Sequence, residues 1–564
     1  PATIKGLEVL FDRLFQRIYA GVEWDEGDIE RLRAAAREGT LILLPSHKSH
    51  IDYLILSYIF NGHNLPLPLI AAGDNLNFFP VGSIFRRGGA FFIRRSFKGD
   101  RLYAAVVDAY VRRLIRDGYP IELFLEGGRS RTGKLLPPKL GLLSMMVDAA
   151  LAVPQKPSFF VPVSIGYEHV IEAVSYEREL KGGEKAKEDA AGLIKSRDVL
   201  RHRYGRINMQ VGQIMSLDLI REELGIQEGQ LSPAKRRAVV TRMGNRVMDE
   251  INRVTAVTPG ALTALTLLSH GQRGLAHAEL VARAGRFLGV LEKLGARISP
   301  ALRSPSGALR AESIREAAQM FADTELIEVR VIEAESSSRR KGEAGPGAFY
   351  VVSENKRLAL DTSKNIIIHF FVERALVSLA YAAAGSEPEL AEVRRLVQEL
   401  SRLFKFEFRF RADRPFDRIF DETVQAMIEA GELALTGERL APGPGHSGWS
   451  GRDWLENYAL LLAPFVEGYL VTARALRFLS KAPLGEKDLV KRALAQGQEM
   501  FLAGEVARQE AVSKPLVQNA LAAFVDHGYV VHRQNYDLGE GYTNPEALAG
   551  IEHNLRRYLP RSVS

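Results

Sequence analysis

The sequence predicts an α/β fold, in which a mixed sheet is flanked by helices, followed by a mainly α-helical C-terminal domain. In the first half of the chain, short apolar runs alternate with stretches of helical periodicity, as in layered strands and helices. After about residue 257, helical stretches dominate. The length of 564 residues also exceeds the size of one compact core. We therefore predict two domains, at residues 1–257 and 258–564.

The first domain is predicted to begin with an amphipathic helix at residues 4–21, where apolar side chains recur at helical spacing. Its apolar stripe suits packing against the core, or contact with a membrane surface. The run TLILLP (40–45) predicts a buried strand ending at Pro45, and IDYLILSYIF (51–60) predicts a helix. The remaining elements are a helix at 100–118 and strands at 67–72, 89–93, 121–126 and 159–167.

The second domain is predicted to be helical, with one β-hairpin. Helical patterns cover three long stretches, at residues 257–271, 277–295 and 389–406. The hairpin has its arms at residues 326–334 and 348–353, joined by a polar loop rich in Gly and Ser.

Composition limits the classes of function. Hydrophobic residues make up 46% and charged residues 25%, which is typical of a globular chain. The net charge of +7 favours anionic partners, whether nucleic acid, phosphorylated metabolites or acidic lipid. The chain has no cysteine, which excludes disulfides, Cys-ligated zinc and thiol catalysis. No signal peptide is visible. The apolar stretch 365–385 carries His369, Glu373 and Arg374 in its middle, so we predict a buried helix there rather than a membrane span.

The first candidate site lies where the strand at 40–45 meets the next helix. Ser49 fits a helix N-cap, and Asp52 fits the matching position of a capping box. This would leave His47 in the preceding loop, with its ring exposed to a cleft. A histidine base needs a carboxylate on its far nitrogen, and Asp52 can supply it. A helix cap alone and a catalytic pair are both compatible with this spacing.

Two further segments gather cations after apolar strands. In IFRRGGAFFIRRSFKGD (84–100), Arg94 belongs to a basic cluster that is either a solvated rim or a phosphate clamp. In LFLEGGRSRTGKLLPPK (123–139), the spacing from Gly128 to Lys134 matches a P-loop. Leu135 stands where a P-loop needs Ser or Thr, and Pro137 prevents a clean helix, so a nucleotide-binding loop is excluded.

Several competing signatures do not occur in the sequence. It contains neither the G-x-S-x-G motif of a serine nucleophile nor the H-E-x-x-H zinc motif. Aromatic-rich basic repeats of an RNA-binding type are also missing. No cluster of metal ligands is apparent, so we expect neither a metal nor a cofactor.

Taken in order, four blocks resemble the motifs of the glycerolipid acyltransferase family. Its patterns H-x-x-x-x-D, G-x-x-F-I-x-R, E-G-x-R-S and V-P-[IV] correspond to His47–Asp52, GGAFFIRR, EGGRSR and FVPVSIGYE. One such motif is weak, but four in order are specific. The surrounding sequence, such as SHIDYLILSY and YERELKG, is similar to bacterial membrane-bound glycerol-3-phosphate acyltransferases. The likeness continues faintly into the helical half, at NIIIHFF.

The resemblance implies an enzyme that transfers a fatty acyl group from an acyl thioester to the sn-1 hydroxyl of glycerol 3-phosphate. The product would be lysophosphatidic acid, and the reaction the first step of phospholipid synthesis. The co-substrate would be acyl-CoA or an acyl carrier protein, without a further cofactor. The expected location is the cytoplasmic face of the inner membrane, by peripheral attachment to an anionic surface, with no nucleic-acid partner.

In this interpretation His47 is the general base and Asp52 stabilises its imidazolium. Arg94 and Arg129 are the expected principal ligands of the acceptor phosphate, with support from Arg131 and Lys134. Glu126 is expected to bond an acceptor hydroxyl or to orient an arginine. The other expected substrate-binding residues are Gly127, Gly128, Ser130 and Pro162.

Two alternatives stay open. Dihydroxyacetone-phosphate acyltransferases share the four blocks, so the acceptor is less certain than the reaction. A protein of a different class would be a basic membrane- or nucleic-acid-binding protein, in which the His47–Asp52 pair serves only as a helix cap.

Overall fold

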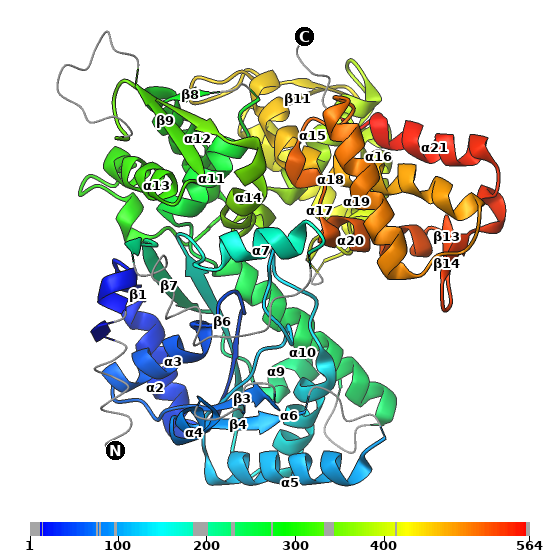
Figure 1. Ribbon diagram of the computed structural model, residues 1–564. Coiled ribbons are helices and arrows are strands. Elements are labelled where there is room, and N and C mark those ends of the chain that lie inside the picture. The colour runs from blue at the N-terminus through cyan, green and yellow to red at the C-terminus, as the bar shows by residue number, and fades with distance from the viewer. Residues whose placement is uncertain are drawn as a thin grey trace.

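A computed structural model describes residues 12–559, apart from residue 14 and the segments 75–76, 78–80, 95–98, 184–200, 227–231, 272–273, 332–342 and 412–413. Half of the helix predicted at residues 4–21 therefore lies outside the described residues. Residues 15–18 are helical, and Phe15 and Ile18 pack into the core. Figure 1 shows an α/β part at the N-terminal end and a larger, mainly helical part above it.

The α/β part is built on a seven-stranded sheet with the order β1-β7-β6-β2-β5-β3-β4. Neighbouring strands are parallel except β6 and β7, which are antiparallel, so the prediction of a mixed sheet is confirmed. The strands are β1 (Gly21–Glu23), β2 (Thr40–Pro45), β3 (Leu69–Gly73), β4 (Ala90–Ile93), β5 (Ile121–Glu122), β6 (Ser158–Tyr167) and β7 (Arg206–Val211).

Helices cover both faces of this sheet, as the side chains of β2 show. Leu41 and Leu43 belong to a core shared with α2 (Glu26–Glu38) and α3 (Asp52–Gly62). The alternate residues Ile42 and Leu44 belong to a core shared with α5 (Arg101–Asp117), α6 (Leu140–Ala152) and α10 (Pro233–Arg253). A strand buried on both faces has a continuous apolar sequence, which explains the run TLILLP. Among the described residues this part also has the helices α4 (Val81–Arg87), α7 (Ala173–Leu180) and α9 (Leu217–Glu223).

The C-terminal part is mainly helical, as predicted, with one large core that runs from Val257 to Tyr558. Its helices are α11 (Pro259–Leu268), α12 (His277–Lys293), α13 (Ala311–Asp323), α14 (Arg357–Asn365), α15 (Val372–Ala384), α16 (Leu390–Leu403), α17 (Phe416–Glu429), α18 (Gly451–Ala475), α19 (Glu486–Leu502), α20 (Lys514–Asp526) and α21 (Pro545–Arg556). The predicted division at residues 257 and 258 stays a prediction.

The predicted hairpin is present, and β9 (Ile327–Val331) pairs with β10 (Ala348–Val352). The short strand β8 (Leu275–Ala276) adds a third strand to it. Two small hairpins were not predicted, namely β11 (Leu433–Thr436) with β12 (Arg439–Pro442) and β13 (Val530–His532) with β14 (Tyr536–Leu538).

The stretch 365–385 is not the single buried helix that was predicted. Helix α14 ends at Asn365, a short 3₁₀-helix follows at Ile368–Phe370, and α15 begins at Val372. Among the described residues, one helical segment, Gly451–Ser480, is long and apolar enough to cross a membrane. In the most apolar 18 residues of this segment, 89% are buried inside the protein. Packing in the core therefore explains why the segment is long and apolar.

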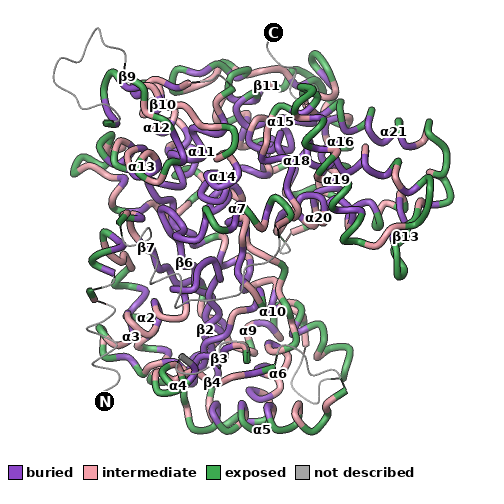
Figure 2. The backbone as a smooth tube through the Cα atoms, viewed as in Figure 1, coloured by how far each residue is buried: buried purple, intermediate pink, exposed green. Residues whose placement is uncertain are grey.

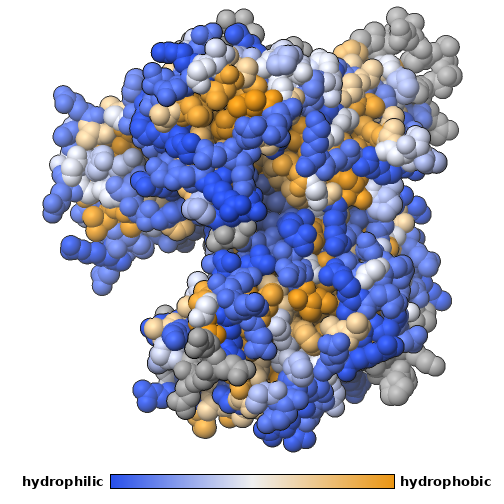
Figure 3. All heavy atoms as spheres, turned by 180° about the vertical axis from the view of Figure 1, so that it is seen from behind, coloured by the Kyte–Doolittle hydropathy of each residue, from blue (hydrophilic) through white to orange (hydrophobic). Residues whose placement is uncertain are grey.

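The two parts are in close contact. Helix α7 of the α/β part packs against α14 and α20 of the helical part. Figure 2 shows buried backbone on both sides of this junction. The opposite side of the molecule, drawn in Figure 3, is mostly hydrophilic and is hollowed between the two parts. The junction therefore brings helical-part residues close to loops at the end of the sheet.

Candidate active site

His47 lies two residues beyond the end of β2, and its backbone is held on both sides. Its N–H donates to Glu126 Oε1 at 2.7 Å. Its carbonyl accepts from the N–H of Ser130 at 2.8 Å. Both partners belong to the glycine-containing loop after β5, so the second chemistry-bearing segment fixes the position of the first.

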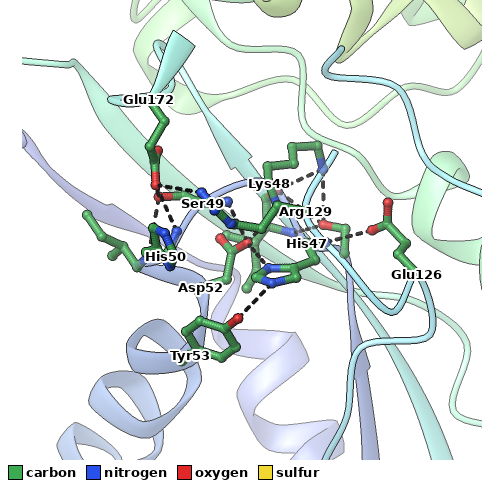
Figure 4. Close-up of polar contacts among 12 residues, drawn as sticks. His47, Lys48, Ser49, His50, Asp52, Tyr53, Glu126, Arg129 and Glu172 are labelled. Carbon is green, nitrogen blue, oxygen red and sulfur yellow. Dashed lines mark hydrogen bonds and ion pairs between the residues drawn. The ribbon is translucent and has the colours of Figure 1, made fainter. Parts of the chain in front are cut away.

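Both ring nitrogens of His47 are engaged (Figure 4). Nδ1 lies 2.9 Å from Asp52 Oδ2, and Nε2 lies 3.0 Å from the Tyr53 hydroxyl. A carboxylate can only accept, so Nδ1 carries the proton and Nε2 keeps a lone pair, which accepts from Tyr53. Phe124 packs on the imidazole, with 4.2 Å between ring centroids. The predicted His47–Asp52 pair is therefore formed.

Asp52 binds more than the histidine. Its Oδ2 also accepts from the backbone N–H groups of Lys48 at 2.6 Å and Ser49 at 2.9 Å. The Tyr167 hydroxyl donates to Oδ1. Four donors on a fully buried carboxylate keep it fixed against the imidazole ring.

The predicted capping box forms only in part. Asp52 accepts from the N–H of Ser49 as a capping box requires, but α3 begins at Asp52 and the residue at its N-cap position is Ile51. The Ser49 hydroxyl instead donates to Glu172 Oε1 at 3.0 Å. The carboxylate of Asp52 points toward His47, because it accepts hydrogen bonds from the loop of residues 47–49.

The prediction of an exposed His47 ring is wrong, because the residue is only 3% exposed. Burial lowers the pKa of His47, and the charges of Arg129 and Arg131 act in the same direction, while Asp52 opposes them. His47 is therefore neutral at neutral pH and able to accept a proton at Nε2. The Tyr53 hydroxyl must move aside before a substrate hydroxyl can take its place.

Glu172, which precedes α7, was missed at the sequence level. Its Oε1 accepts from the N–H of His50 at 2.9 Å and from Ser49. The Arg129 guanidinium lies 3.8 Å away, in a buried ion pair. Burial raises the pKa of Glu172, although its hydrogen bonds and Arg129 oppose the rise. The signal was present just after the fourth block, in GYEHVIE (166–172), where a carboxylate follows the predicted strand at 159–167.

Arg129 and Arg131 lie on the loop that holds His47. Arg129 Nη1 donates to the Tyr176 hydroxyl at 2.7 Å. Arg131 Nε donates to Glu179 at 3.1 Å, and its Nη1 donates to the carbonyl of Arg129 at 2.7 Å. The two guanidiniums flank the ring of Tyr176. The loop thus presents two ordered cations whose charges reach His47.

The other predicted loop residues take different positions. Both carboxylate oxygens of Glu126 accept backbone N–H groups, from His47 and from Leu136, so Glu126 braces the loop. Its predicted role toward an acceptor hydroxyl or an arginine stays a prediction. Lys134 is buried and paired with Glu407 of the helical part. The Ser130 hydroxyl donates to the carbonyl of Lys134. Gly127 packs on the Lys139 side chain, and the space above Gly128 is open.

Arg94 and Pro162 are not brought into this cluster. Arg94 is exposed at the end of β4 and donates to Asp100 at 2.9 Å. Strand β4 is three places from β2, and adjacent strands lie about 4.8 Å apart, which puts it roughly 14 Å away. The last arginine of the G-x-x-F-I-x-R pattern falls on Arg95, outside the described residues. Pro162 is buried within β6, paired with Leu44, rather than on a loop.

Metal coordination has no visible support in this part of the molecule. Within the ranges that the structure describes, no group of three or more His, Asp or Glu side chains could hold a metal ion.

A buried His–Asp pair at the carboxyl end of a parallel strand, beside two arginines, defines an α/β protein equipped for general-base chemistry on an anionic substrate. Comparison makes this more specific. Residues 176–533 match the family described as "Glycerol-3-phosphate acyltransferase C-terminal region", and residues 27–166 match the one described as "Acyltransferase". The chain belongs to the glycerol-3-phosphate acyltransferase family.

Individual relatives share this description. A protein of Pseudomonas fluorescens strain Pf-5 is 32% identical over 99% of this chain and 65% of its own length. One of Ectopseudomonas mendocina is 28% identical over the same shares, 99% and 65%. One of Alteromonas mediterranea is 41% identical over 50% of this chain and 35% of its own length. All three are named glycerol-3-phosphate acyltransferase, and the chain spans between about a third and two thirds of their length.

A solved structure of a 1-acyl-sn-glycerophosphate acyltransferase, PlsC from Thermotoga maritima, matches 44% of this chain and 78% of its own. The sequence identity is 16% and the TM-score 0.25.

Proposed function

We propose that this chain transfers a fatty acyl group from an acyl thioester to the sn-1 hydroxyl of glycerol 3-phosphate, giving lysophosphatidic acid. The names of its relatives support the substrate. The observation that carries the proposal is the buried His47–Asp52 pair, because Asp52 holds the imidazole in the tautomer that keeps Nε2 basic. A helix cap alone would not need a histidine held through both backbone groups and both ring nitrogens.

The proposed reaction needs one proton carrier. His47 Nε2 takes the proton of the acceptor hydroxyl while the oxygen attacks the thioester carbonyl. The tetrahedral intermediate then collapses, the carbon–sulfur bond breaks, and the imidazolium returns its proton to the leaving thiolate. Asp52 stabilises the imidazolium in between. Because the chain has no cysteine and no nucleophile elbow, we favour direct transfer over an acyl-enzyme.

The acceptor phosphate is proposed to bind Arg129 and Arg131. Both guanidiniums lie on the loop that also holds His47, and guanidinium groups match phosphate oxygens. Phosphate binding by Arg94 stays a prediction, since this residue is exposed and bonded to Asp100. Lys134 is a poorer candidate than predicted, because Glu407 already neutralises its charge.

Membrane attachment is proposed to be peripheral, on the cytoplasmic face of an anionic inner membrane. The net charge of +7 and the long acyl chain of both donor and product support this location. Acyl-CoA and acyl carrier protein are both compatible donors.

The test is an assay of thiol release and product identity with purified protein. Glycerol 3-phosphate and dihydroxyacetone phosphate are each supplied with acyl-CoA and with acyl carrier protein. We expect lysophosphatidic acid with glycerol 3-phosphate. If thiol is released with dihydroxyacetone phosphate but not with glycerol 3-phosphate, the proposed acceptor is wrong. If no combination of donor and acceptor releases thiol, the proposed acyl transfer is contradicted.

A further inference from the structure

The loop after β5 spans from His47 to the helical part of the molecule. Its base, Glu126 and Ser130, holds the N–H and the carbonyl of His47. Its tip, residues 131–134, lies against α14 and the segment that follows α16. The Ser130 hydroxyl bonds the carbonyl of Lys134, so base and tip are tied together. A displacement of the tip would therefore reach the histidine through one hydrogen-bonded loop.

The contacts at the tip come from several helical-part residues. Asn365 Nδ2 donates to the carbonyl of Thr132 at 3.0 Å. The Thr362 hydroxyl donates to the carbonyl of Arg131 at 3.4 Å. The backbone of α14 also fits closely over the tip, because a methyl group on Gly133 would lie 2.0 Å from the Thr362 carbonyl oxygen.

A buried ion pair completes the attachment. The Lys134 ammonium pairs with Glu407, a fully buried carboxylate just beyond α16. The rings of Phe408 and Phe465 surround the ammonium at 5.2 and 4.5 Å. A desolvated pair of this kind is sensitive to the loss of either partner, because the remaining charge is left buried and uncompensated.

We propose that Glu407, together with Asn365, is a positioning residue of the active site, and that Lys134 acts as its anchor rather than as a phosphate ligand. The helical part thereby sets the position of His47 and of the two loop arginines through the tip of the loop. The kinetic side of this proposal rests on the proposed acyl transfer; the structural side does not.

The role of Lys134 separates positioning from phosphate binding. If Lys134 only anchors the loop, replacing both partners by apolar residues should restore much of what a single replacement destroys. If Lys134 binds the acceptor phosphate, every variant without it should keep a raised KM for glycerol 3-phosphate, whatever stands at position 407.

The experiment compares Glu407→Gln, Lys134→Met and the double variant Lys134→Met/Glu407→Leu. Glu438→Gln, at an exposed turn of the helical part, is the matched control. Small misplacements of reacting groups cost up to about a hundredfold, so we expect each single variant to lose roughly ten- to a hundredfold in kcat. The KM of the acyl donor should hardly change, and the double variant should regain at least half of the loss on a logarithmic scale.

Backbone hydrogen exchange gives a readout that does not depend on activity. Peptides covering residues 126–136 should exchange faster in Glu407→Gln and in Asn365→Ala, with Glu438→Gln unchanged. Asn365→Ala tests the same contact without leaving a buried charge unpaired, so it replaces Glu407→Gln if that variant does not fold. Unchanged exchange in folded variants would overturn the proposal. If the variants exchange faster but the parent protein shows no acyl transfer, the proposed anchoring of the loop still holds and only the proposed function is refuted.

Discussion

At the scale of single residues, the lone pair on His47 Nε2 already has a hydrogen-bond donor in the free protein. The Tyr53 hydroxyl lies 3.0 Å from Nε2, the atom that takes the proton in the proposed reaction. This hydroxyl occupies the position that the acceptor hydroxyl must reach. The free site is therefore closed by a group that the substrate has to displace.

Replacing Tyr53 by phenylalanine tests this competition. The ring stays in place, but Nε2 loses its partner in the free protein. One hydrogen bond is worth about 0.5–1.5 kcal/mol, so Tyr53→Phe should raise acceptor kcat/KM by roughly two- to tenfold. Steady-state kinetics against the control Tyr119→Phe, an exposed tyrosine, measure the effect. A large loss of activity would mean that the hydroxyl takes part in the chemistry.

Glu126 gives a prediction about pH. Burial raises its pKa from 4.5 to about 7, although Lys48 and the N–H groups of Leu136 and His47 oppose the rise. A raised pKa in the folded state contributes stability that is complete below pH 4.5 and lost as the pH rises through about 7. Glu126→Gln removes this titration.

The wild-type protein should therefore lose stability relative to Glu126→Gln between pH 5 and pH 8, by roughly 2–4 kcal/mol at about 1.4 kcal/mol per pKa unit. Urea unfolding of both proteins at the two pH values measures this difference. Parallel pH dependence of the two unfolding free energies would contradict the assignment.

The contact between His47 and Asp52 could be predicted from residue spacing, because the two residues are five positions apart where β2 leads into α3. The partners of Glu126 and Lys134, a backbone N–H and Glu407, could not be predicted, since they come from distant parts of the chain. The role of Arg94 stays a prediction, because a basic cluster in the sequence carries no information about its distance from His47.

At the scale of elements, the loop of residues 123–139 is the part that unites the site. Strands were predictable where apolar runs are buried on both faces, as in β2. The break between α14 and α15 was not, because the apolar run 365–385 continues through it. The close fit of the loop tip against α14 could not be predicted either, since it depends on tertiary packing.

Alanine substitutions at two glycines measure how much the contact between the loop tip and α14 contributes. Gly133 and Gly307 both have a φ of +81°, so alanine at either position is strained. Only Gly133 has a neighbour in the way, the carbonyl oxygen of Thr362. Gly307→Ala should cost about 1–2 kcal/mol of stability and leave kcat unchanged. Gly133→Ala should cost more and also lower kcat.

Thermal unfolding and turnover of the two variants measure both effects. Because the backbone strain is the same, the difference between the variants reports on the contact with α14. Equal losses of stability with equal kcat values would show that the tip does not need this contact.

At the scale of the whole molecule, the sequence predicted an α/β part followed by a helical part, and both are present (Figure 1). What composition could not predict is that the helical part contacts the loop beside His47. Its apolar helix α18 is buried inside the protein. The proposed peripheral attachment to a membrane is therefore supported by the net charge of +7.

Binding to liposomes tests this basis. The basic chain should bind vesicles that contain anionic lipid, and it should not bind vesicles of neutral phosphatidylcholine. In about 1 M salt the screening length falls to roughly 3 Å, so most of the bound protein should be released. Protein that stays with the vesicles in high salt and needs detergent for extraction would contradict peripheral attachment.

The most direct test of the account is the turnover of His47→Ala. If His47 is the base, the variant should release thiol from acyl-CoA with glycerol 3-phosphate about a hundred- to ten-thousand-fold more slowly than the parent protein. His553→Ala, which changes an exposed histidine on α21, should keep normal activity. A folded His47→Ala protein with near-normal turnover would contradict the central claim that the buried His47–Asp52 pair performs the proton transfer.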